Sequence, residues 1–111
     1  MEMNYAKEVL ARKRVDQLLA SGELSEDDCA HLDQIHDVTP SAAGCGKCLD
    51  LGDPWVNLRI CLTCGHVGCC DNSINKHATK HHHATGHPVI QSFQPDETWI
   101  YCYPDEDVIA P

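Results

Sequence analysis

The apolar and polar positions in the first third of the chain predict two helices. Residues 4–20 contain neither Gly nor Pro and carry apolar side chains among charged ones, as a helix does. Gly22 breaks this helix, and Ser25 then begins a Ser-Glu-Asp-Asp stretch that resembles a capping box. A second helix is predicted over residues 26–36, so residues 1–37 are expected to form a helical hairpin.

The pattern changes after this hairpin. Residues 38–44, VTPSAAG, are small and punctuated by Pro and Gly, which is typical of a linker. Residues 45–111 then alternate short apolar runs with turns. The predicted strands cover residues 55–62, 66–69, 88–93 and 98–103, and a predicted helix covers residues 73–83 and ends at Gly86–Pro88. This pattern predicts an α+β fold, a small metal-stapled domain with a short antiparallel sheet and one or two helices behind the N-terminal hairpin.

Length and cysteine content explain why such a domain needs metal. A chain of 111 residues buries a limited core, and it carries eight Cys and eight His. The N-terminus has no apolar signal-peptide region, and no run of about 18 apolar residues predicts a membrane span. We therefore expect a cytoplasmic protein whose cysteines bind metal, rather than a secreted disulfide framework.

Net charge narrows the class of partner. The formal charge is −9, and only eight residues are Lys or Arg. Nucleic-acid binding draws most of its affinity from basic side chains that neutralise phosphates, so this composition argues against DNA or RNA. A basic peptide or a protein fits the acidic field better.

The strongest chemical signal is a pair of Cys-x-x-Cys motifs twelve residues apart, Cys45–Cys48 and Cys61–Cys64. A two-residue spacer lets both sulfurs of a pair face one ion. Further thiol and imidazole donors follow in the chain: Cys69, Cys70, His77, His81 and His87. Thiolates and imidazoles in tetrahedral sites favour zinc, and two zinc ions would use eight ligands.

Five histidines lie between Asn75 and Pro88. His77 and His81 are four residues apart, so a helix places them on one face, where they serve either one shared zinc or two neighbouring zincs. His87 precedes a proline, which favours an extended backbone just after the helix. His82 and His83 point away from that face, and we expect both in solvent.

Nothing in this stretch predicts catalysis. The HATKH sequence has the spacing of the HExxH hydrolase motif, but Ala78 stands where the glutamate is needed. The His-x-Glu signature of zinc deaminases is also absent. Enough Cys and His are present to close both sites, so we expect structural zinc and no catalytic residue.

With these motifs in hand, residues 45–111 resemble the UBP-type zinc finger, the ubiquitin-binding domain of ubiquitin-specific proteases and cytoplasmic histone deacetylases. The resemblance is carried by CGKC, WVNL, CLTCGHVGC, HATKH, TGHP and WIYCYPDEDV, and the GCCD variant is similar to prokaryotic members. It implies a non-catalytic module that captures a protein or peptide terminus, the C-terminal tail of ubiquitin in the family.

The resemblance also implies which residues share each ion. One zinc would be held by Cys45, Cys48, Cys69 and His77. The other would be held by Cys61, Cys64, His81 and His87. Family members usually have glycine right after the Cys that matches Cys69, whereas this chain has Cys70. Because the length of the Cys–His loop varies between members, Cys70 is an alternative to Cys69. Some members carry a third site in the tail, but here we expect two ions, with Cys29 and Cys102 as buried small apolar residues.

In ubiquitin-binding members an aromatic pocket and a loop arginine hold the free Gly-Gly tail. The matching aromatics here are Trp55, Tyr101 and Tyr103, whereas Trp99 is expected in the core. Asp71 stands where the family places the arginine, and a carboxylate cannot donate to a peptide carboxylate. Ubiquitin held in the usual way is therefore not the expected ligand.

Two alternatives from other functional classes stay open on the sequence alone. The first is a zinc- or thiol-dependent enzyme that uses a spare thiol such as Cys70 or Cys102. The second is an assembly adaptor in which residues 1–37 mediate oligomerisation.

Overall fold

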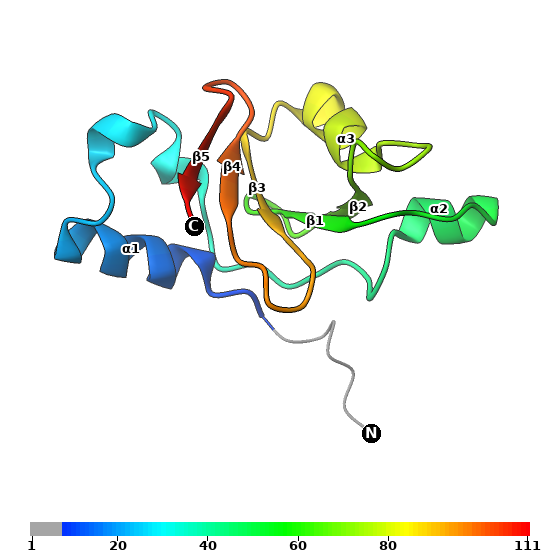
Figure 1. Cartoon of the computed structure of the whole chain (residues 1–111), viewed down its shortest axis with the longest axis horizontal. Helices are drawn as coiled ribbons and strands as arrows, with labels where there is room; N and C mark the ends of the chain where they lie inside the picture. The colour runs from blue at the N-terminus through cyan, green and yellow to red at the C-terminus, as the bar shows by residue number, and fades with distance from the viewer. Residues whose placement is uncertain (1–7) are drawn as a thin grey trace.

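The computed structural model describes residues 8–111 and confirms the α+β fold (Figure 1). Five strands form one antiparallel sheet in the order β2-β1-β3-β4-β5. The strands are β1 (Leu58–Cys61), β2 (Val67–Cys69), β3 (Val89–Ser92), β4 (Ile100–Cys102) and β5 (Asp107–Ala110). The helices are α1 (Ala11–Ser21), α2 (Gly46–Leu51) and α3 (His77–Thr85).

Strand register decides which side chains meet on each face of the sheet. Arg59 pairs with Ser92, Ile90 with Tyr101, and Tyr101 with Val108, so these side chains share one face. Helix α3 covers this face, and its Ala78 lies directly against Gly68 of β2.

The other face of the sheet forms the main core. Ile60, Val89 and Ile100 are fully buried there. They belong to one apolar cluster with residues of the N-terminal segment, including Val15 and Ile35, both of which are fully buried as well. These apolar side chains of the N-terminal segment therefore pack into this chain's own core. Side chains that are buried there are not available for the oligomerisation suggested for residues 1–37.

Helix α1 begins later than predicted. Residues 4–7 of the predicted helix lie outside the described residues, and Val9 instead pairs with Val38 through two backbone hydrogen bonds of 2.7 and 3.0 Å. The helix ends as predicted at Gly22, which has φ +82° and donates its N–H to Leu19.

The predicted second helix over residues 26–36 is wrong. Two short 3₁₀ turns, Glu26–Asp28 and Leu32–Gln34, occupy this range. The capping box at Ser25 is present, but Cys29 is extended (φ −158°, ψ 129°) and turns its side chain into the protein. Burying that thiol interrupts the helix, and Asp27 and Asp28, which have low helix propensity, do little to oppose the interruption.

Residues 38–44 run along the zinc-finger half rather than away from it. Val38 is buried, Ser41 N donates to Gly65 O (2.9 Å), and Ser41 Oγ accepts from Val67 N (2.9 Å). Gly65 has φ +86°, and any Cβ there would collide with the carbonyl of Thr39.

Strands β1 to β4 lie within the predicted ranges, but two elements escaped prediction. Helix α2 is only six residues long and starts at a glycine, so its pattern is weak. Strand β5 begins in the acidic tail and is held by backbone pairing with β4 rather than by an apolar pattern. In the described part of the chain, no helix has the length and apolar character needed to span a bilayer.

Candidate metal centres and aromatic cavity

The first cluster consists of Cys45, Cys48, Cys69 and His77, all of them buried. Nδ1 of His77 lies 3.2, 3.4 and 3.6 Å from the sulfurs of Cys45, Cys48 and Cys69 respectively. The start of α2, the end of β2 and the first residue of α3 bring these side chains together. The backbone N–H of His77 also donates to Cys69 Sγ (3.1 Å).

The second cluster consists of Cys61, Cys64, His81 and His87. Cys64 Sγ lies 3.3 Å from His81 Nε2, and Cys61 Sγ lies 3.5 Å from His87 Nδ1. Burial lowers the pKa of His81 to about 4, which keeps the imidazole neutral, as a metal ligand must be. Burial raises the pKa of Cys61 to about 11, so a bound cation has to displace that thiol proton.

These two clusters divide the histidines of α3. His77 and His81 are one turn apart, yet each faces a different cysteine pair, so the arrangement with two neighbouring sites is the one seen. His82 was expected in solvent, but it is partly buried and makes contacts within the protein. Its Nδ1 lies 2.8 Å from the carbonyl of His87, and its ring stacks on Tyr103 at 4.3 Å. His83 is exposed, as predicted.

The structure places Cys69, not Cys70, in the first cluster. The Cys70 sulfur instead lies 3.5 Å from Ser73 Oγ, at the edge of the cavity described below. Burial raises the pKa of Cys70, but hydrogen bonding from Ser73 and the nearby Arg59 charge outweigh it and leave the pKa below its usual value.

Cys29 and Cys102, which were expected only as buried small apolar residues, also belong to a third cluster of possible metal ligands. Both are buried, and their sulfurs lie 3.5 Å apart across 73 residues of sequence. His31 Nδ1 lies 3.4 Å and Asp105 Oδ2 3.5 Å from Cys102 Sγ. The four donor atoms lie within 4.8 Å of one another, as in the other two clusters. This cluster joins the N-terminal segment to the β4–β5 turn.

Each cluster supplies a donor set that suits zinc. Two or three soft sulfurs with one or two imidazoles, and an oxygen in the third case, are typical of four-coordinate zinc. All eight cysteines are free thiols in the structure. Zinc binding is therefore the chemistry that these residues support.

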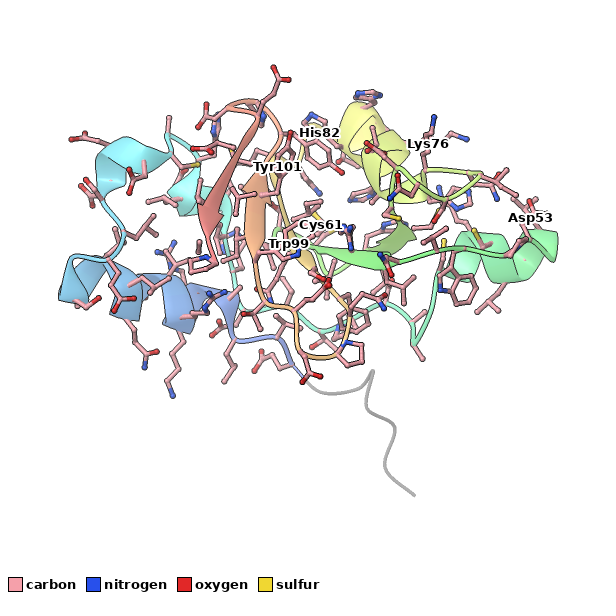
Figure 2. All side chains as sticks on the ribbon, viewed as in Figure 1. Asp53, Cys61, Lys76, His82, Trp99 and Tyr101 are labelled. Carbon is pink, nitrogen blue, oxygen red and sulfur yellow. The ribbon has the colours of Figure 1, made fainter. Side chains whose placement is uncertain are left out.

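A cavity of about 670 Å³ lies between α3 and the sheet. Its walls are Arg59, Cys70, Asp71, Ala78, Thr79, His82, His83, Ile90, Trp99, Tyr101, Tyr103, Glu106 and Val108. Figure 2 labels three of these wall residues, His82, Trp99 and Tyr101. The volume is in the range of ligand pockets, and the walls combine aromatic rings with charged and polar side chains.

The predicted binding residues are partly brought together here. Tyr101, Tyr103 and Asp71 line the cavity, but Trp55 does not. The ring of Trp55 packs so closely on Gly44 that a Cβ there would lie 2.8 Å from it. Trp99, which was expected in the core, lines the cavity instead.

Polar contacts hold the Asp71 side of the cavity in place. Thr79 Oγ1 donates to Asp71 Oδ1 (2.6 Å) and lies 3.3 Å from the Tyr103 hydroxyl. Tyr103 meets Tyr101 edge to face at 5.4 Å. Burial raises the pKa of Tyr103, so its phenol stays neutral and able to donate.

Arg59 is the basic residue of the cavity wall, and it was not among the binding residues predicted from the sequence. It lies on β1, and its guanidinium carbon is 4.5 Å from the centre of the Trp99 ring. The signal for it was the strand alternation in LRIC, which places Arg59 on the same face as Cys61, the face covered by α3.

Sequence comparison places these features among known proteins. A family profile described as "Zn-finger in ubiquitin-hydrolases and other protein" matches residues 45–111. Ubiquitin carboxyl-terminal hydrolase 14 of Schizosaccharomyces pombe is 42% identical over 79 residues, covering 62% of this chain and 10% of that protein. The human BRCA1-associated protein is 36% identical over 63 residues, covering 57% of this chain and 10% of that protein. The chain thus spans about a tenth of these relatives.

Structure comparison gives a match of similar size to this chain. The solution NMR structure of protein RPA1320 from Rhodopseudomonas palustris is 60% identical, with a TM-score of 0.70. The match covers 74% of this chain and 80% of that one.

Proposed function

The chain belongs to the family of zinc fingers found in ubiquitin hydrolases and other proteins, and we propose that it is a non-catalytic, zinc-stabilised module that binds the end of a protein or peptide. The observation that carries this proposal is the aromatic-walled cavity between α3 and the sheet. The zinc sites hold both walls of the cavity, since α3 supplies a ligand to each of the first two clusters.

The proposal includes three zinc ions rather than the two expected from the sequence. Cys29, His31, Cys102 and Asp105 offer the same number of donors at the same spacing as the two clusters of the zinc-finger half. An ion there ties the N-terminal segment to the β4–β5 turn. A metal at such a junction contributes directly to folding.

A binding role is preferred to an enzymatic one because the clusters are closed. Each offers four possible protein ligands, enough to fill a tetrahedral zinc site, whereas a catalytic zinc keeps a coordination position open for water or substrate. The relatives include proteins named as hydrolases, but the region shared with them is a zinc finger. Free thiols rather than disulfides suit a reducing compartment, and we place the protein in the cytoplasm on that ground.

The proposed ligand is a terminus like that of ubiquitin, and ubiquitin itself in the usual mode is disfavoured. Asp71 faces the cavity where the family places an arginine, and it already accepts a hydrogen bond from Thr79. A ligand must therefore find a donor for its carboxylate elsewhere in the cavity, or present a basic group to Asp71.

NMR titration tests this proposal directly. The ¹⁵N-labelled, zinc-loaded protein is titrated with free ubiquitin and with short peptides that end in a free Gly-Gly carboxylate. We expect saturable shifts at residues of α3 and β4 that line the cavity. Absence of such shifts with every probe up to about 1 mM would refute the proposal.

The two tryptophans supply a matched pair of variants for this titration. Trp99→Leu removes a cavity wall and is expected to weaken binding about tenfold or more, which corresponds to about 1.4 kcal/mol. Trp55→Leu removes a comparable ring outside the cavity and is expected to leave affinity nearly unchanged. Equal losses in the two variants would place the ligand somewhere other than the cavity.

A further inference from the structure

Arg59 stands apart from the other basic residues of the chain by its position. It is the only Lys or Arg among the described residues that line the cavity, and it is partly buried on β1. Within residues 8–111, carboxylates approach Arg12 and His31 to within 4.0 Å, but none approaches Arg59. A guanidinium that lines a cavity and has no carboxylate of the described residues within 4.0 Å is available to an anionic ligand.

Two contacts fix the orientation of the Arg59 guanidinium. Arg59 Nη1 donates to the carbonyl of Leu58 (3.0 Å), and the guanidinium lies over the Trp99 ring at 4.5 Å. These two contacts fix the plane of the group, while an arginine has five N–H donors in all. A side chain already fixed in place loses less freedom when it binds a carboxylate.

We infer that Arg59 is the carboxylate-binding residue of the cavity, and that the ligand is a peptide C-terminus. Resting on the proposed function, this inference names the group that recognises the terminus. A donor on strand β1 would then do what Asp71 cannot do from its loop. The planar guanidinium matches a free carboxylate in a bidentate arrangement, and the tyrosine walls enclose the small residues that precede it.

The rest of the cavity predicts what precedes the carboxylate. Asp71 and Glu106 line the same space as Arg59 and carry negative charge. They favour a peptide with a basic residue shortly before its end and disfavour one with an acidic residue there. Arg59 would then bind the negative C-terminal carboxylate of the ligand, while Asp71 and Glu106 would attract a basic side chain shortly before it.

The test compares two versions of each Gly-Gly peptide, one with a free carboxylate and one with a C-terminal amide. The wild-type protein is expected to bind the free acid at least about tenfold more tightly, or 1.4 kcal/mol. Arg59→Gln is expected to lose this preference and bind both versions equally weakly. Lys80→Gln removes one positive charge from the exposed, opposite part of α3, outside the cavity, and is expected to change affinity less than about twofold.

The outcomes separate this inference from the proposed function. If both peptide versions bind the cavity and Arg59→Gln changes neither, the inference is overturned and the proposed function stands. If no peptide of either version binds, the proposed function falls and takes the inference with it. Zinc content and the NMR spectrum of Arg59→Gln must match the wild type, and Arg59→Lys should recover part of the preference for the acid.

Discussion

The contact between Gly68 and α3 makes a quantitative prediction for the zinc sites. A Cβ at Gly68 would lie 2.7 Å from Ala78 N and 3.0 Å from His77 C, both backbone atoms that cannot rotate away. Ordinary contact begins near 3.4 Å, so the start of α3 must retreat by about 0.7 Å (3.4 less 2.7) in a Gly68→Ala variant.

That retreat is large compared with what metal coordination tolerates. Ligand distances in a zinc site vary by only about 0.2 Å, and α3 carries His77 and His81 into two different clusters. Overpacking of this kind costs about 1–3 kcal/mol. We expect Gly68→Ala to lower the free energy of unfolding by that amount and to accelerate zinc loss to a chromogenic chelator.

Urea unfolding of the zinc-loaded protein and the rate of chelator-induced zinc release measure the two effects. Gly46→Ala is the matched control, because its nearest neighbour is Ala42 Cβ at 4.0 Å and alanine suits helix α2 better than glycine. It should be neutral or stabilising by up to about 1 kcal/mol. If Gly68→Ala unfolds and releases zinc like Gly46→Ala, the coupling of α3 packing to the metal sites is refuted.

Two further predictions concern the metal and pH. Cys102→Ser should lower the zinc content measured by mass spectrometry from three ions per chain to two, and leave Cys29 newly reactive toward maleimide; an unchanged content would remove the third site. The lowered pKa of His81 means that the unfolded chain binds a proton between pH 6.5 and about 4 that the folded chain does not. The urea midpoint should therefore fall as pH is lowered through this window, with zinc released alongside, and a midpoint that stays flat from pH 7 to 4.5 would contradict the shift.

Local features of the fold were predictable from local chemistry. The strands β1 to β4, the helix end at Gly22 and the capping box at Ser25 depend on residues close in sequence. Where burial of one side chain competes with local propensity, prediction failed, as at Cys29, whose thiol turns inward and divides the expected helix into two 3₁₀ turns.

The sequence by itself determined the chemistry of the donors, because each Cys-x-x-Cys spacing places two thiols in one turn and the His-x₃-His spacing places two imidazoles on one helix face. Only the tertiary structure decided how His77 and His81 are divided, because both alternatives satisfy the same helix. It also decided that Cys29 meets Cys102 across 73 residues, and that Arg59 and Trp99 face one cavity. The contact between Cys29 and Cys102 depends on how the N-terminal segment packs, and the shared cavity of Arg59 and Trp99 depends on strand register. Both are long-range features that a local sequence pattern does not determine.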